Sequence, residues 1–69
     1  MAPSLSDLRA AVVASHDEVE RAWQDRILAL RSGNRAQLAV AELRLAQARQ
    51  RRNAAEVAMI AAEEEALDR

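Results

Sequence analysis

A single glycine divides a long run of helix-forming residues, and this feature constrains the fold more than any other. Between residues 5 and 67 there is no proline, and Gly33 is the only glycine. On both sides of it the chain is dominated by Ala, Leu, Arg, Glu and Gln, all of which favour the helix. Residues 31–34, Arg-Ser-Gly-Asn, hold the only turn chemistry, because a glycine that follows a helix readily takes a positive φ.

The sequence therefore predicts an all-α fold in a single domain of residues 1–69, with helices over 5–31 and 35–67 and a turn at 32–34. So short a joint makes consecutive helices antiparallel neighbours, which gives a coiled-coil-like two-helix hairpin. Ser4 and Asp7 mark the first helix start as an S-x-x-D form of the capping box. The structural alternative is one continuous helix through Gly33.

Composition argues against several other classes of protein. Alanine supplies 17 of the 35 hydrophobic residues, Trp23 is the only aromatic residue, and cysteine is absent. Such a chain lacks the residues of an all-β fold, of a disulfide scaffold and of a thiolate metal site. It is too short to wall an enzyme pocket, and no apolar run approaches the ~18 residues of a membrane span. We therefore expect a cytoplasmic, non-enzymatic protein without a cofactor.

Charged residues favour the antiparallel arrangement. Folding about Gly33 brings an acidic block level with a basic block of the second helix. The two blocks are Asp17, Glu18 and Glu20, and Arg44, Arg49, Arg51 and Arg52. Each exposed ion pair contributes only ~0–1 kcal/mol, so the main effect expected of these charges is to fix register and direction.

The two predicted helices differ in how their apolar residues are distributed. The first has one apolar arc, formed by Leu5, Leu8, Val12, Val19, Trp23 and Leu30, with Ile27 at its edge. The second has two stripes more than a quarter-turn apart. One stripe contains Ala39, Leu43, Ala46, Gln50, Ala54, Val57, Ile60 and Ala61, and the other contains Leu38, Ala41, Leu45, Ala48, Ala55, Met59 and Ala62.

One helix can cover only one of these stripes, so the other is predicted to bind a partner. Because Leu43, Val57 and Ile60 are the bulkier set, we expect them to pack inside the hairpin. The predicted partner-binding residues are then Leu38, Ala41, Leu45, Ala48, Arg52, Ala55, Met59 and Ala62. The expected cover is a helical protein chain or a second copy of the hairpin, and no membrane.

Three further features were weighed as chemical sites. His16 has only Glu20 nearby as a second ligand, so a half-buried structural histidine is expected rather than a metal site. Residues 49–53, Arg-Gln-Arg-Arg-Asn, suggest phosphate binding, but the net charge is −1 and no aromatic residues interleave for base stacking. Trp23 is expected to pack across the hairpin, with a binding hot spot as the alternative.

The turn and the start of the second helix resemble the small helical-hairpin co-chaperones of type III secretion needle subunits. The similarity lies in residues 30–34, Leu-Arg-Ser-Gly-Asn, in Gln37 and Leu38, and in the alanine-spaced residues 42–48. It covers about twenty residues, and Leu38 stands where such chains often have an aromatic residue. The resemblance implies a non-enzymatic protein that docks by one helical face onto a larger helical-repeat chaperone and keeps a polymerising subunit monomeric.

Three functions follow as hypotheses from these observations. The first is an adaptor or co-chaperone that docks on another protein. The second is a self-assembling structural hairpin, such as a component of a phage particle or another assembly. The third is a small regulator that binds nucleic acid through the face from Arg44 to Arg52.

Overall fold

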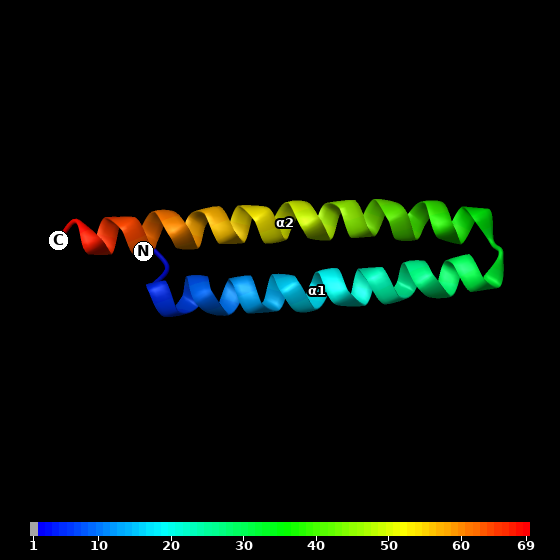
Figure 1. The fold of residues 1–69 in the computed structure, drawn as a ribbon, viewed down its shortest axis with the longest axis horizontal. Helices are drawn as coiled ribbons and strands as arrows, with labels where there is room; N and C mark the ends of the chain where they lie inside the picture. Colours follow the sequence, from blue (N-terminus) through cyan, green and yellow to red (C-terminus); the bar gives the residue numbers. More distant parts are fainter. Residues whose placement is uncertain (1) are drawn as a thin grey trace.

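The computed structural model describes residues 2–69, and these form two antiparallel helices (Figure 1). Helix α1 spans Leu5–Ser32 and helix α2 spans Arg35–Leu67, with no strand in the described part of the chain. The hairpin measures 54 × 19 × 14 Å, and the carboxyl end of α2 extends beyond the start of α1. The predicted all-α antiparallel hairpin is confirmed, and α1 continues one residue further than expected. Neither helix is both long and apolar enough to cross a membrane.

Local side-chain chemistry determines where each helix begins and ends. The Ser4 hydroxyl accepts from the Asp7 amide at 3.1 Å and the Asp7 carboxylate accepts from the Ser4 amide at 3.3 Å, which completes the predicted capping box. Helix α1 ends at Gly33, which has a left-handed φ of 69°. Asn34 then caps α2, because its side-chain oxygen accepts from the Gln37 amide at 3.1 Å.

The two helices meet along faces whose residues are spaced alternately three and four apart. On α1 the buried or half-buried positions with this spacing are Leu5, Leu8, Val12, Ser15, Val19, Ala22, Arg26 and Ala29. On α2 they are Leu38, Ala41, Leu45, Ala48, Arg52, Ala55, Met59 and Ala62. We call the α2 set the inner stripe. This alternation is the spacing of a coiled-coil interface.

Small residues at every seventh position let the two backbones approach closely. Ser15, Ala22 and Ala29 on α1 are buried, as are Ala41 and Ala48 on α2. The core cluster consists of Ala22, Leu45 and Ala48, with Val19 packed against it. Larger and smaller side chains thus alternate along the interface, and the distance between packed helices depends on the side chains at their contact.

Candidate functional site

The structure exchanges the two faces of α2 relative to the expectation from the sequence. Leu45 is 4% exposed, whereas Leu43 is 60% exposed and Val57 is 67% exposed. The prediction that Leu43, Val57 and Ile60 pack against α1 is therefore wrong. The residues predicted to bind a partner are the inner stripe, and they contact α1 instead: Leu38, Ala41, Leu45, Ala48, Arg52, Ala55, Met59 and Ala62.

Polarity explains why the helices choose this pairing. The stripe that contains Leu43 and Val57 is interrupted midway by Gln50 and Asn53, and burial of an unpaired amide costs free energy. The inner stripe has only Arg52 as a polar interruption. The long side chain of Arg52 leaves the interface to place its Nε 3.7 Å from Glu56 and its Nη2 3.2 Å from the Asn53 oxygen.

Polar contacts line one edge of the interface at seven-residue intervals. Arg9 lies 3.6 Å from Glu63, and the His16 Nε2 lies 3.1 Å from the Glu56 carboxylate. One further interval along α1, the guanidinium of Arg49 lies 6.0 Å from the centre of the Trp23 ring. These contacts join α1 to α2 in one register along most of the hairpin.

This edge corrects two expectations from the sequence. His16 is exposed rather than half-buried, with more than half of its side-chain surface accessible beside Glu56. Trp23 lies at the edge of the interface rather than inside it, between the guanidinium groups of Arg26 and Arg49. In the described residues 2–69 there is no group of three or more His, Cys, Asp or Glu side chains placed to hold a metal ion.

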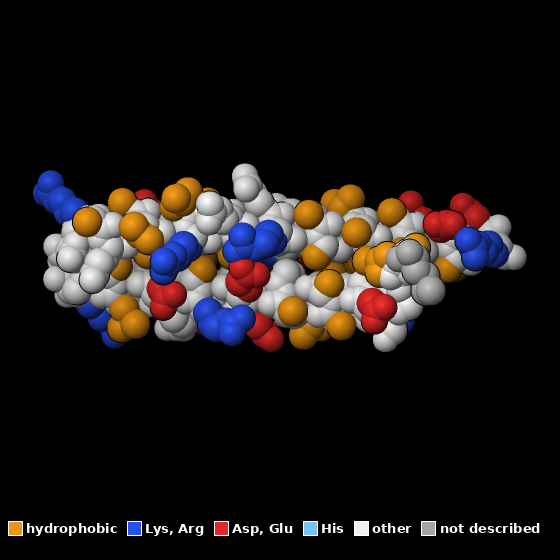
Figure 2. All heavy atoms as spheres, turned by 180° about the vertical axis from the view of Figure 1, so that it is seen from behind, with side chains coloured by type: hydrophobic (Ala, Val, Ile, Leu, Met, Phe, Trp, Pro, Cys, Tyr) orange, Lys and Arg blue, Asp and Glu red, His pale blue; other side chains and the backbone are white. Residues whose placement is uncertain are grey.

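The opposite edge carries the charge pairing expected between the acidic and basic blocks. Glu18 pairs with Arg51, and toward the turn the Ser32 hydroxyl lies 3.4 Å from the Gln37 side-chain oxygen. Figure 2 shows charged side chains gathered between the two helices and hydrophobic groups spaced along each of them. The arginines of residues 49–53 thus have partners within the hairpin: Trp23 for Arg49, Glu18 for Arg51 and Glu56 for Arg52.

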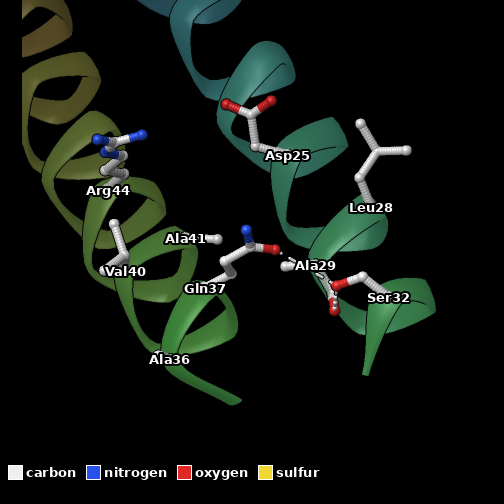
Figure 3. A pocket seen from close by; sticks show the side chains of 9 residues that line it. All are labelled: Asp25, Leu28, Ala29, Ser32, Ala36, Gln37, Val40, Ala41 and Arg44. Atoms are coloured by element: carbon white, nitrogen blue, oxygen red, sulfur yellow. Dashed lines mark hydrogen bonds between the residues drawn. The ribbon is translucent and has the colours of Figure 1, made fainter. Parts of the chain in front are cut away.

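A groove of about 590 Å³ runs along this second edge beside the turn (Figure 3). Leu28, Ala29 and Ser32 line it from α1, and Val40 and Ala41 line it from α2. Asp25 and Arg44 lie on opposite sides of its far end, and Leu28 points away from α2. The groove is thus mainly apolar along its floor and charged at one end, with no nucleophile and base side by side.

The second face of α2 is the larger unpartnered surface. Its residues follow the same alternation of three and four and are all exposed: Ala39, Leu43, Ala46, Gln50, Asn53, Val57 and Ile60. We call this set the outer stripe. It differs from the stripe recognised in the sequence by Asn53, which takes the place that strict spacing gives it in preference to Ala54.

Surface area shows how much of the hairpin is available for contact. The hairpin exposes 5307 Å², whereas a compact monomer of 7.6 kDa exposes about 4,300 Å². The difference, about 1,000 Å², is close to the ~800 Å² that one partner contributes to a typical stable interface.

Comparison with protein-family models, with curated proteins and with solved structures finds no match to this chain.

Proposed function

We propose that this chain is a non-enzymatic interaction module that docks on a helical protein through the outer stripe of α2. The observation that carries this proposal is the exposed series of apolar residues on a helix whose opposite face is already covered by α1. An apolar helical face with this spacing is suited to lie against another helix or in a groove between helices. The arginine pairing within the hairpin makes the nucleic-acid hypothesis the weaker one.

The resemblance at the turn supports a finer version of the same proposal. In it, the hairpin acts in the cytoplasm as an adaptor or co-chaperone, and the partner is a larger helical chaperone, as in type III secretion needle complexes. The outer stripe replaces the inner stripe as the docking surface in this version, because the inner stripe is occupied by α1.

Affinity capture from the native host with matched variants tests the proposal. Leu43→Glu places a charge on the outer stripe at a side chain that is already 60% exposed, so the isolated chain should keep its helicity. It should lose a protein that the wild-type hairpin captures. Val13→Glu is the control, since Val13 is 63% exposed on the other helix, and it should retain that protein.

Leu45→Glu separates binding from folding in the same experiment. Leu45 is buried in the core cluster, so a carboxylate there should unfold the hairpin and lower its circular dichroism signal. If Leu43→Glu retains every captured protein while it remains helical, the outer stripe is not the docking surface.

A further inference from the structure

We infer that the free chain covers its outer stripe with a second copy of itself, as an antiparallel dimer in which the two α2 helices lie against each other. The inference rests on the proposed function in one respect, the use of the outer stripe as the contact surface. It adds the identity of the occupant when no other partner is present. The same stripe would then serve self-association and partner binding, which exclude each other.

The order of residues along the outer stripe is self-complementary. A two-fold axis midway between Gln50 and Asn53 places Leu43 opposite Ile60 of the second copy and Ala46 opposite Val57 of the second copy. Gln50 then faces Asn53 of the second copy, so that the amides meet each other at the centre. Two large residues and a small–large pair fill each half, and the amides satisfy one another.

This pairing is specific to one register. A shift by one seven-residue interval in one direction sets Gln50 against Ile60 of the second copy, and a shift in the other sets Leu43 against Asn53 of the second copy. Either shift buries an amide against an aliphatic side chain, which costs free energy. A single polar layer that selects register and partner number is an established feature of coiled coils.

Charges beside the stripe agree with the same register. The offset that brings Glu18 to Arg51 within the hairpin places Arg49 of one copy beside Glu56 of the second copy, twice by symmetry. The register also brings Glu42 near Glu63 of the second copy. Each of these glutamates has an arginine in its own hairpin, Arg26 at 3.7 Å and Arg9 at 3.6 Å respectively.

The area available is sufficient for a stable pair of chains. Two hairpins that each bury the excess of about 1,000 Å² would remove about 2,000 Å² in total, within the range of stable interfaces. The product is a four-helix arrangement in which α2 of each chain contacts α1 on one face and the other α2 on the opposite face. A hairpin has a single internal seam, and the second seam is the usual way for short helical chains to gain a larger core.

Sedimentation of the purified chain tests the oligomeric state. The wild type should sediment at twice the 7.6 kDa chain mass at micromolar concentration, and Leu43→Glu should sediment as a monomer with unchanged helicity. Val13→Glu should remain a dimer. A wild type that stays monomeric up to millimolar concentration overturns the inference, and the proposed function would still be judged by the capture experiment.

Cross-linking through single cysteines tests the direction of the helices, because the chain has no cysteine of its own. The offset that joins His16 to Glu56 brings Ala54 beside Ala54 of the second copy, so Ala54→Cys should form a linked dimer with a short bis-maleimide. Ala39 lies on the same stripe but would be about 37 Å from its own copy at 1.5 Å per residue, so Ala39→Cys should not link. Linking through Ala39→Cys instead would mean a parallel pair and would overturn the proposed arrangement.

Discussion

Alanine at every seventh position decides which side of α2 turns toward α1. Ala48 is 1% exposed and Ala41 is 6% exposed, so there is almost no space beside either methyl group. Bulk alone led the sequence analysis to place Leu43 inside, because a larger side chain buries more apolar area. Close approach of two backbones along the whole seam outweighs a few larger side chains, and that depends on spacing rather than on size.

The turn residues were the most predictable part of the molecule. Ser4 with Asp7 and Gly33 act through local backbone chemistry, which does not depend on the rest of the fold. The environments of His16 and Trp23 depend instead on the register between the helices. A shift of the contact face around α2 moved both residues from the expected interior to the edge of the seam.

Gly33→Val tests the left-handed turn at the residue scale. A Cβ at this position would meet no atom within 4 Å, so the cost should come from the backbone alone. With φ at 69°, a β-branched residue should lower the free energy of unfolding by about 1–2 kcal/mol in denaturant titration. Gly33→Asn should cost less, because asparagine tolerates this conformation. A neutral Gly33→Val would mean that the turn does not require it.

At the scale of the element, α2 is a helix with two working faces and α1 has one. The hairpin itself could be predicted, because Gly33 is the only interruption and the joint is short. The presence of two stripes on α2 could also be predicted from their spacing. The choice between them could not, because both contain leucine and alanine, and the deciding difference is a pair of amides on one stripe against Arg52 on the other.

Ala48→Leu and Ala46→Leu form a matched pair that reports on this choice. Added volume at Ala48 should force the helices apart and destabilise the hairpin by about 1–3 kcal/mol, measured by thermal unfolding. Ala46 is exposed on the outer stripe, so the same change there should leave the stability of the monomeric hairpin nearly unaltered. Both measurements belong in the Leu43→Glu background, so that self-association does not contribute. Equal effects at the two positions would contradict the assignment of faces.

At the scale of the whole molecule, stability and association are linked. A hairpin with one seam of mostly small residues has little apolar area to bury, and chains of this length often need a second seam. If the free chain is a dimer, its melting temperature should rise with protein concentration, because association favours the folded state by mass action. Calorimetry or circular dichroism over a hundredfold range of concentration measures this. Leu43→Glu should melt at a temperature that is independent of concentration.

The overhang of α2 and the position of the core together determine how the hairpin opens. The buried apolar residues Ala22, Ala29, Ala41, Leu45 and Ala48 all lie in the half nearer the turn. Contacts near the two termini are only half-buried, and they close the longest loops of the hairpin, which carry the greatest entropic cost. Local unfolding should therefore begin at the termini and proceed toward Gly33. Amide hydrogen exchange should follow the same gradient, fastest near Leu8 and Met59 and slowest beside Ala22 and Leu45. In each such opening the free end of the inner stripe is the first hidden apolar surface that water, a protease or another chain meets.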